Sequence, residues 1–347
     1  MTTHTVLVTG ANGYIGNAVA RAFVRAGWIT YGLVRSPLSE QKLAAEEIIP
    51  VVGIIDSRET HRSIQKALPA RLDAIVSTTE SLKDYGVHFE NTIHLLRLLG
   101  ASSTAAGRQP IVIFTSGCKD YGIGPHVDGE PGPPPHTEET PLRPPPVVAA
   151  RTKFSVKIFD HTDLFGAVLV RPTNVFGRGS TYYQNFFAVA EQIADEGGRL
   201  IMEAPPNHII HALHVDDCGD AYVAIASHPR VDEVRGQVFN ISSYRYETVD
   251  EISRALITEY NIQGDPEYVD PKGRDAVLWM PMLVNFPQWV DSTKLRTVTG
   301  WNDRRPLFSE AIHVYRLAYE AAKEAGDEGV LRVQHVMGRI TRPRNLL

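Results

Sequence analysis

Short apolar runs alternate with amphipathic segments along the first half of the chain. Runs of about four to eight residues between turn-forming residues are typical of buried strands, and the segments between them repeat apolar residues at helical spacing. Strands separated by helices predict an α/β fold with a doubly wound parallel sheet. The predicted strands are Val6–Thr9, Ile29–Val34, Ile48–Ile55, Ala74–Thr78, Ile111–Thr115 and Ala167–Val170, and the predicted helices among them are Tyr14–Ala26, Glu59–Leu68 and His88–Leu99.

The pattern changes after Arg171, where helical stretches and short apolar runs no longer alternate regularly. These pieces predict a smaller second part of the fold that ends in two closing helices. The predicted helices are Tyr182–Ala194, Asp216–Ala226, Val249–Tyr260, Asp291–Thr299 and Leu307–Glu320, and the predicted strands are Leu200–Glu203 and Gln237–Ile241.

Nine prolines lie between Pro125 and Pro146, together with several glycines and acidic residues. Because proline lacks a backbone N–H group, this stretch is neither regular helix nor central strand. Two interpretations stay open: a solvated surface loop, or a flap over the active site. The basic tail after Gly326 also fits two interpretations, a loose end or a subunit contact. Its arginines are Arg332, Arg339, Arg342 and Arg344.

The composition fits a globular protein with a large core. The chain has 347 residues, 43% hydrophobic and 22% charged, with a formal net charge of −5. It shows no basic stripe and no apolar run as long as a membrane span, so we expect neither nucleic acid nor a membrane as partner. Two cysteines, Cys118 and Cys218, predict no disulfide framework and a cytoplasmic location. His208, His211 and His214 are spaced for an extended segment, and we expect no metal site.

The most specific motif is the glycine-rich stretch after the first predicted strand. Gly10, Gly13 and Gly16 follow that strand at three-residue intervals, and a helical pattern comes next. Gly10 allows the chain to turn, Gly13 lets backbone N–H groups approach a phosphate, and Gly16 lets the helix pack close to the sheet. A strand, a tight turn and a helix N-terminus in this order predict a binding site for a dinucleotide diphosphate.

The spacing Gly-x-x-Gly-x-x-Gly, preceded by Thr9, resembles that of the extended and atypical short-chain dehydrogenases/reductases, the NAD-dependent epimerase/dehydratase family. The resemblance covers the chain from about Val6 to about Glu320. It implies a Rossmann-like sheet, a smaller C-terminal substrate lobe and a nicotinamide dinucleotide. On this basis we expect a dinucleotide-binding domain over residues 1–175 with returning segments near 207–243, a substrate lobe over 176–206 and 244–325, and a tail over 326–347.

The end of the second predicted strand bears on the choice of coenzyme. An NAD site usually has Asp or Glu there for the ribose 2′-hydroxyl. This chain has Arg35 instead, which can pair with a 2′-phosphate. We therefore favour NADP(H), with NAD(H) as the alternative. Relatives often have Gly-Asp after the third strand to contact the adenine, but here Ile54 follows Gly53 and Asp56 comes two places later.

The resemblance implies further contacts to the coenzyme. Asn91 matches a helix asparagine that orders a proton-relay water. The stretch from Arg171 to Gly177 is similar to Arg-Pro-x-x-Val-Tyr-Gly, whose backbone lines the nicotinamide amide. His214-Val215-Asp216-Asp217 resembles an element that is mainly structural. The expected cofactor-binding residues are Gly10, Asn12, Gly13, Tyr14, Ile15, Gly16, Arg35, Asp56, Thr78, Lys153, Arg171, Pro172 and Asn174.

The chain departs from the family at the catalytic tyrosine. Relatives use a Ser or Thr with Tyr-x-x-x-Lys on a helix, in which the tyrosine exchanges the proton and the lysine holds the ribose. Here Lys153 matches the lysine, which places Ala149 at the tyrosine position. The family hydroxyl position falls on Gly117, and Ser116 and Thr115 are the nearest hydroxyls. The resemblance therefore implies Ser116, Thr115, Lys153 and Asn91 as the catalytic residues.

A literal Tyr-x-x-x-Lys does occur from Tyr268 to Lys272, but Pro271 is incompatible with a helix interior there. The chain therefore lacks the usual acid, which contributes about 10²–10⁴-fold in rate. Another side chain has to replace it if the protein transfers protons in the family manner. The candidates are Tyr182, Tyr183, Tyr121 or a histidine.

Three functions stay open. The leading prediction is an NADP(H)-dependent oxidoreductase that acts on a small organic metabolite. The alternatives are a redox-neutral epimerase, isomerase or cyclase, and a non-catalytic NADP(H)-binding regulator, because the fold is compatible with all three. Relatives commonly dimerise through the helices after the fourth and fifth strands, so a homodimer is an expectation. The expected substrate contacts are Glu80, Cys118, Tyr182 and Tyr183.

Overall fold

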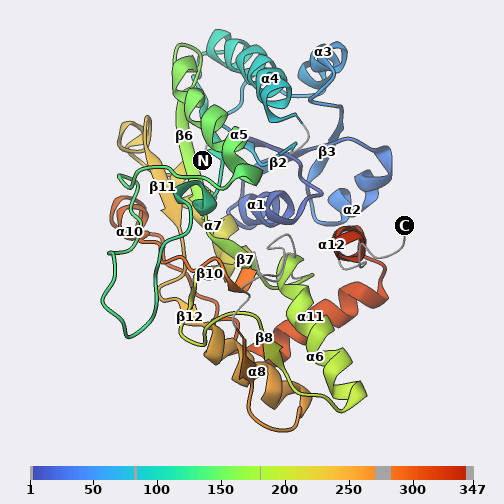
Figure 1. Ribbon diagram of the computed structural model, residues 1–347. Coiled ribbons are helices and arrows are strands. Elements are labelled where there is room, and N and C mark those ends of the chain that lie inside the picture. Colours follow the sequence, from blue (N-terminus) through green and yellow to red (C-terminus); the bar gives the residue numbers. More distant parts are fainter. Residues whose placement is uncertain (1–2, 82–83, 180, 270–282, 341–347) are drawn as a thin grey trace, which may run out of the picture.

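The computed structural model describes residues 3–81, 84–179, 181–269 and 283–340 (Figure 1). Its centre is a sheet of seven parallel strands: β1 (Thr5–Thr9), β2 (Ile29–Val34), β3 (Ile49–Val52), β4 (Ala74–Ser77), β5 (Ile111–Thr115), β6 (Gly166–Pro172) and β11 (Val238–Ile241). The strand order is β11-β6-β5-β4-β1-β2-β3. The chain leaves β1 first toward one edge and then toward the other, so the expected doubly wound, Rossmann-like fold is confirmed, with its switch point between β1 and β4.

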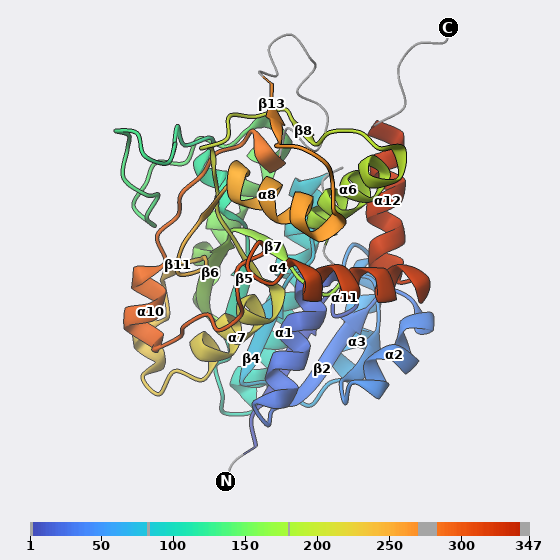
Figure 2. The same ribbon diagram turned by 90° about the horizontal axis from the view of Figure 1, so that it is seen from below.

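One face of the sheet is covered by α1 (Tyr14–Arg25) and α7 (Val215–Ala226), which lie side by side in front of the strands in Figure 2. Phe23 and Tyr222 from these helices share a buried cluster with Val8 of β1. Strands buried on both faces explain why the first half of the sequence shows continuous apolar runs in place of strict alternation.

The other face is covered by α3 (Arg58–Lys66), α4 (Tyr85–Ala105) and α5 (Pro146–Ser155). Leu96 of α4 and Phe114 of β5 belong to a second buried cluster there. None of the helices in the described ranges is both long enough and apolar enough to cross a bilayer.

The C-terminal part is built around α6 (Gln184–Glu196), α8 (Val249–Tyr260) and α11 (Ile312–Glu324), which enclose a third apolar cluster around Phe308. Short strand pairs border this cluster. They are β7 (Asn174–Phe176) with β10 (Ala212–His214), β9 (Ile209–Ile210) with β12 (Glu247–Thr248), and β8 (Ile201–Met202) with β13 (Glu267–Tyr268).

Part of the predicted tail folds back onto the chain. Residues Glu328–Ile340 form α12, which lies beside α2 (Glu40–Ala45) in Figure 1. Lys42 Nζ on α2 lies 2.7 Å from Asp327 Oδ2 at the start of α12. The remaining elements are η1 (Pro37–Ser39), η2 (Cys118–Tyr121), η3 (Val156–His161), η4 (Thr181–Tyr183), η5 (Val231–Glu233) and α10 (Thr293–Thr299).

The proline-rich segment is packed against the chain in its second half. The His136 N–H group donates to the Trp289 carbonyl oxygen at 2.8 Å, and the His136 carbonyl accepts from Asp291 N at 2.9 Å. The Glu138 carboxylate accepts from the backbone N–H of Asn240 in β11 at 2.7 Å. Residues 128–134 are exposed. The segment is therefore a loop docked beside β11 with a solvated tip.

The turn between β1 and α1 requires glycine. Gly10 has φ of +66°, a conformation that costs little only without a side chain. A Cβ atom on Gly16 would lie 2.2 Å from the Gly10 carbonyl oxygen and 2.6 Å from Thr78 Oγ1. The Thr78 hydroxyl in turn donates to the Thr9 carbonyl oxygen at 2.6 Å. The turn is therefore fixed between β1 and β4 at the sheet's switch point.

We predict that Gly16→Ala lowers the free energy of unfolding by about 1–3 kcal/mol, because the added methyl group meets backbone atoms that cannot move aside. Urea denaturation followed by circular dichroism measures this change. Gly198→Ala is the matched control, since the Cβ atom there would meet Ile193 at an ordinary 3.7 Å. Equal stability of the two variants would contradict the close packing described for the turn.

Candidate active site at the carboxyl ends of the strands

The N-terminus of α1 offers unpaired donors to a ligand. Its N-cap residue Gly13 has no side chain, and no acidic residue lies in the first turn. The N–H groups of that turn therefore have no capping acceptor, and the positive end of the helix dipole is uncompensated. Tyr14 and Ile15 are half-buried, and Gly16 is buried. This arrangement of backbone donors fits the diphosphate of a dinucleotide.

The glycine turn is joined to the loop after β2. The exposed Asn12 donates from Nδ2 to Ser39 Oγ at 3.1 Å. A Cβ atom on Gly32 of β2 would lie only 2.8 Å from the Ala11 side chain, so this glycine permits the close approach of the turn. The glycine turn and the β2 exit loop therefore form one continuous surface.

Arg35 lies on this surface, directly after β2, and its side chain is exposed. Ser36 next to it caps η1 by accepting from the Leu38 N–H group at 3.2 Å. Within the described ranges, no carboxylate pairs with the Arg35 guanidinium. Arg35 is therefore available for an anionic group near the glycine turn.

Asp56 ends a row of hydrogen-bonded side chains that leads back to the glycine turn. Its Oδ1 lies 2.7 Å from Nδ1 of His88, whose Nε2 lies 3.2 Å from Thr79 Oγ1. A Cβ atom on Gly10 would lie 3.0 Å from the Thr79 methyl group. The structure therefore brings Asp56 to the same edge as Gly10, as a half-exposed carboxylate held by a buried histidine.

Asn91 uses its side chain within the protein. Its Oδ1 accepts from Arg58 Nε at 2.9 Å, and its Nδ2 donates to the Asp56 carbonyl oxygen at 3.3 Å. These bonds join α4 to α3 and to the loop after β3. The role of Asn91 in holding a relay water stays a prediction.

The carboxylate of Asp120 is the centre of a buried polar network after β5. It has no solvent exposure. Arg151 donates to Oδ1 from Nη2 at 2.9 Å and from Nε at 3.2 Å, and Thr152 Oγ1 donates to the same atom at 2.8 Å. Ser116 donates to Oδ2, and Arg171 Nε lies 3.5 Å from Oδ2. Four side chains from three segments therefore meet at one anion.

Neither predicted hydroxyl is presented to a ligand in this arrangement. The Ser116 hydroxyl is buried and donates to Asp120. The Thr115 hydroxyl lies 2.9 Å from the hydroxyl of Tyr222 in α7. Both groups hold the end of β5 to its neighbours, and the binding of the substrate oxygen by either of them stays a prediction.

Several other predicted contacts are buried in the protein interior. Arg171 donates from Nη1 to the Tyr121 hydroxyl at 3.0 Å, and Tyr121 donates to Asn240 Oδ1 at 2.7 Å. Cys118 donates from Sγ to the Arg171 carbonyl oxygen at 2.9 Å, and burial raises the pKa of this thiol. Tyr183 is 1% exposed among aromatic rings of the C-terminal cluster. Cys118 and Tyr183 are thus buried side chains, and their contact with a substrate stays a prediction.

The predicted side chains on the outer part of the site are more open. Lys153 and Ala149 are both exposed on α5, one helical turn apart. Glu80, in the loop after β4, lies 3.4 Å from Arg151 Nη1. Tyr182 is 52% exposed, and burial of its hydroxyl together with the nearby Glu80 carboxylate raises its pKa. Pro172 ends β6 and Asn174 begins β7, half-buried.

A model of the NAD dependent epimerase/dehydratase family matches residues 6–242, which is more than half of the chain. The chain belongs to this family. The resemblance predicted from the glycine motif is therefore confirmed.

One curated relative is a 4-hydroxy-2-methyl-3-oxo-4-farnesyl-3,4-dihydroquinoline-1-oxide ketoreductase of Stigmatella aurantiaca. It is 28% identical over 108 residues, 31% of this chain and 32% of that protein. The chain thus spans about a third of the length of this curated relative.

Solved structures share the fold over nearly the whole chain. A dTDP-glucose 4,6-dehydratase from Bacillus anthracis in complex with NAD has a TM-score of 0.69 and 18% identity, covering 93% of this chain and 98% of that one. A UDP-glucose 4-epimerase from Thermotoga maritima, solved with UDP-glucose, has a TM-score of 0.67 and 18% identity, covering 92% and 99%.

Within this epimerase/dehydratase fold, Asp120, Arg151 and Lys119 are the residues near the site that sequence reasoning missed. Gly117 lies beside Arg151, since a Cβ atom on Gly117 would be 3.3 Å from Arg151 Nη2. Asp120 is separated from Arg151 by the proline-rich segment, so no local spacing relates them. One indication of these residues was present in the sequence. Gly117 stands where the family has a hydroxyl, and a glycine leaves space for a side chain from another segment.

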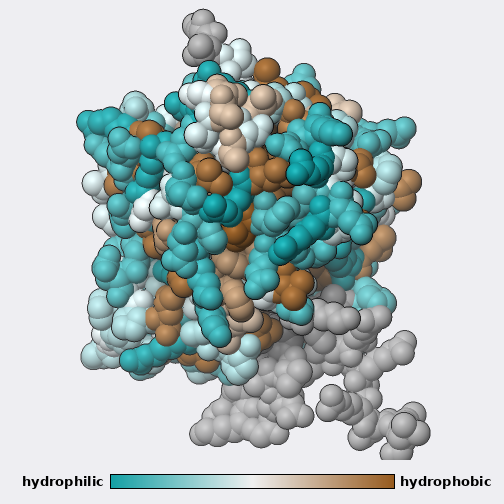
Figure 3. Space-filling view, turned by 90° about the horizontal axis from the view of Figure 1, so that it is seen from above, coloured by the Kyte–Doolittle hydropathy of each residue, from teal (hydrophilic) through white to brown (hydrophobic). Residues whose placement is uncertain are grey.

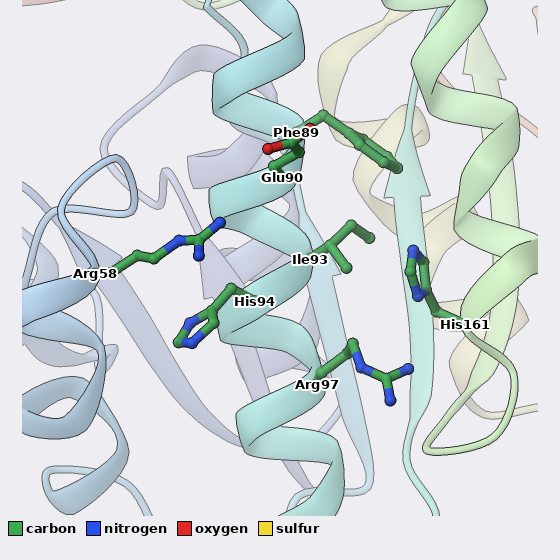
Figure 4. A pocket seen from close by; sticks show the side chains of 7 residues that line it. All are labelled: Arg58, Phe89, Glu90, Ile93, His94, Arg97 and His161. Carbon is green, nitrogen blue, oxygen red and sulfur yellow. The ribbon is translucent and has the colours of Figure 1, made fainter.

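A hollow elsewhere on the molecule lies on the outer face of α4, between α3 and η3 (Figure 4). It is lined by Arg58, Phe89, Glu90, Ile93, His94, Arg97 and His161. Figure 3 shows this side of the molecule, where apolar side chains form a band between hydrophilic ones. Val87 and Val147, on α4 and α5, are 53% and 56% exposed. This is the side on which relatives are expected to dimerise, and a homodimer stays a prediction.

We predict that Asp120→Asn lowers the free energy of unfolding by about 3–5 kcal/mol, because it leaves the buried Arg171 guanidinium without its carboxylate and Arg151 with Glu80 alone. Chemical denaturation at neutral pH measures this loss. Asp232→Asn serves as the control, since that carboxylate also pairs with an arginine but its side chain is 88% exposed. A small loss at Asp120, equal to that of the control, would show that the network does not stabilise the fold.

Proposed function

We propose that the protein is an NADP(H)-dependent oxidoreductase that acts on a carbonyl or hydroxyl group of a small organic metabolite, with an acid other than the family tyrosine. The observation that carries this proposal is the pairing of an uncapped glycine turn with an exposed, unpaired Arg35 on one surface. A diphosphate and a 2′-phosphate are the two anions of NADP(H) that such a surface would hold.

In this proposal, different residues bind different parts of the coenzyme. Backbone N–H groups at Tyr14 and Ile15 bind the diphosphate, and Arg35 binds the 2′-phosphate. Lys153 on α5 anchors the ribose next to the nicotinamide, as the resemblance implies. When bound, the coenzyme supplies or accepts hydride. Asp56, held by His88, would contact the adenine end of the coenzyme.

Two observations support a redox reaction over the alternatives. The curated relative named above is a ketoreductase, although the match covers a third of its length. The Arg151 guanidinium also lies beside Gly117, and such a group suits a carbonyl oxygen that gains negative charge during reduction. A redox-neutral isomerisation or a purely regulatory protein would bind the coenzyme without net oxidation.

Binding and turnover experiments separate these functions. Affinities for NADPH, NADP⁺, NADH and NAD⁺ are measured by fluorescence, and ketones, aldehydes and enones are then screened by loss of NADPH absorbance. Oxidation of bound NADPH by a carbonyl compound is the expected result. Tight NADPH binding without oxidation over a broad panel would favour the redox-neutral enzyme or the regulator.

We predict that Arg35→Ala weakens NADPH binding by about 10–100-fold, the effect of losing a charge-assisted hydrogen bond worth about 1.5–3 kcal/mol. NADH affinity is expected to stay unchanged, because NADH lacks the 2′-phosphate. Fluorescence titration of both coenzymes measures the ratio. Arg25→Ala, which removes an exposed arginine at the far end of α1, is the control. An unchanged NADPH affinity in the Arg35 variant would refute the coenzyme assignment.

We predict that Ala149→Tyr increases carbonyl reduction, because the introduced phenol stands one helical turn before Lys153, the family arrangement for an acid worth about 10²–10⁴-fold. Ala150→Tyr is the matched control on the adjacent exposed position of α5. Initial rates with NADPH and an aryl ketone give the comparison. Equal rates for the two variants, with NADPH affinity retained, would mean that α5 does not face the reacting carbonyl.

A further inference from the structure

The helix α12 joins the two parts of the fold, between α2 above it and α11 below it in Figure 1. Directly before the helix, Asp327 Oδ2 lies 2.7 Å from Lys42 Nζ of α2. The Val330 carbonyl oxygen accepts from Gln184 Nε2, at the start of α6, at 3.5 Å. A Cβ atom on Gly179 would lie 3.3 Å from the Val330 side chain. The start of α12 therefore contacts the nucleotide domain and the C-terminal part at once.

The two neighbours of α12 are both bonded to the first turns of α1, where the diphosphate of the coenzyme is proposed to bind. On the side of α2, Asn17 donates from Nδ2 to Glu46 Oε2 at 2.6 Å. On the other side, the Tyr14 hydroxyl donates to the Gly177 carbonyl oxygen at 2.5 Å. Gly179, which meets α12, follows in the same loop. The helices α1, α2 and α12 and the loop after β7 thus form a closed ring of contacts beside the diphosphate site.

The described part of α12 is held by few buried side chains. Among the side chains of residues 328–335, those of Val330 and Val333 are buried, whereas α1 has six buried residues. The ion pair between Lys42 and Asp327 joins side chains that are 61% and 29% exposed, and such exposed pairs stabilise little. Segments with little buried apolar surface open at a low cost in free energy. We therefore expect α12 to move away while α1 and the sheet stay folded.

The helix also borders the side of the site where a substrate is expected. Tyr182, one of the expected substrate contacts, lies in η4 directly before α6. Burial and the Glu80 carboxylate raise the pKa of Tyr182, and the Arg332 guanidinium of α12 acts in the opposite direction. The exposed Arg332 is therefore close enough to Tyr182 to influence its hydroxyl. A movement of α12 would change the surroundings of the substrate as well as those of the coenzyme.

We propose that α12 is a strap over one end of the coenzyme site, which opens to admit NADP(H) and closes again once the coenzyme is bound. This inference rests on the proposed function. A dinucleotide held by the N–H groups of Tyr14 and Ile15 lies against the ring of contacts, so its entry and its release require the ring to open. The part that opens is α12, because it is held by few buried side chains. Movements of this kind set the rate of ligand exchange in many enzymes. The strap therefore controls how fast NADP(H) exchanges, and the residues beneath it control how tightly the coenzyme binds.

The first test breaks the ion pair from either side, in Lys42→Met and in Asp327→Asn, and follows NADPH binding by stopped-flow fluorescence. Both variants are expected to bind and release NADPH about two- to fivefold faster with little change in affinity, since an exposed ion pair contributes little more than that. The two substitutions change the charge in opposite directions, so an effect of charge alone would have opposite signs. Arg25→Met, which breaks an equally short exposed pair between α1 and α7, is the control. Unchanged rates, or effects of opposite sign, would overturn the proposal.

The second test closes the strap with a removable link. Lys42→Cys and Asp327→Cys are combined in the full chain, and the two thiols are joined by 1,2-ethanediyl bismethanethiosulfonate, a link that dithiothreitol releases. Cys118 and Cys218 are both buried, so the reagent reaches the introduced thiols first. Association of NADPH is expected to slow by about tenfold or more in the linked protein and to recover after reduction. Equal association rates before and after reduction would contradict the proposal.

The control link joins Arg25→Cys to Asp220→Cys, which ties α1 to α7 away from α12 and is expected to leave the rate unchanged. Hydrogen exchange of the full chain without coenzyme tests the opening by itself. Backbone amides of residues 331–335 are expected to exchange faster than those of α7 and to be slowed by the link at α12. Protection of α12 equal to that of α7 would overturn the strap even if NADPH binds. Failure of the unlinked wild type to bind any nicotinamide coenzyme would instead refute the proposed function, and the strap's role in coenzyme exchange with it.

Discussion

The carboxylate of Asp120 is withdrawn from water and accepts from Ser116, Thr152 and Arg151 while Arg171 lies beside it. Removing one ion from water costs several kcal/mol even after relaxation, so such a group is tolerated only when its partners are all in place. The segments that carry those partners are the exit of β5, helix α5 and strand β6. Their relative positions are therefore fixed together, and the cation beside Gly117 is fixed with them.

This constraint explains how the family scaffold can be retained while the side chains at these segments differ. In relatives the acid comes from α5 and the hydroxyl from the end of β5. Here α5 contributes Arg151, and the end of β5 contributes a glycine in place of the hydroxyl. The two segments still meet, since the Arg151 guanidinium of α5 lies beside Gly117. The Arg151 guanidinium keeps its position without a phenol, because its hydrogen bonds to Asp120 orient it.

The fold and the glycine turn could be predicted from the sequence because their signals are local. Val6–Gly16 encodes a strand, a turn and a helix within one short stretch, and Ile29–Val34 and Ile111–Thr115 were placed at the bounds of β2 and β5. Asp120 and Arg151 could not be paired, since the proline-rich segment and the first turn of α5 separate them in sequence. The short helix α2 was missed for a different reason: a helix of under two turns shows too little periodicity to be recognised.

The ion pair between Lys42 and Asp327 has a consequence for the order in which the molecule can be completed. The coenzyme-binding half of the sheet consists of early residues, yet the exposed side of α2 pairs with Asp327, the residue before α12. During synthesis the N-terminal strands can assemble as they emerge, since domains generally fold from that end. The side of the nucleotide domain around α2 acquires its last neighbour when the final helix docks, long after the glycine turn has formed.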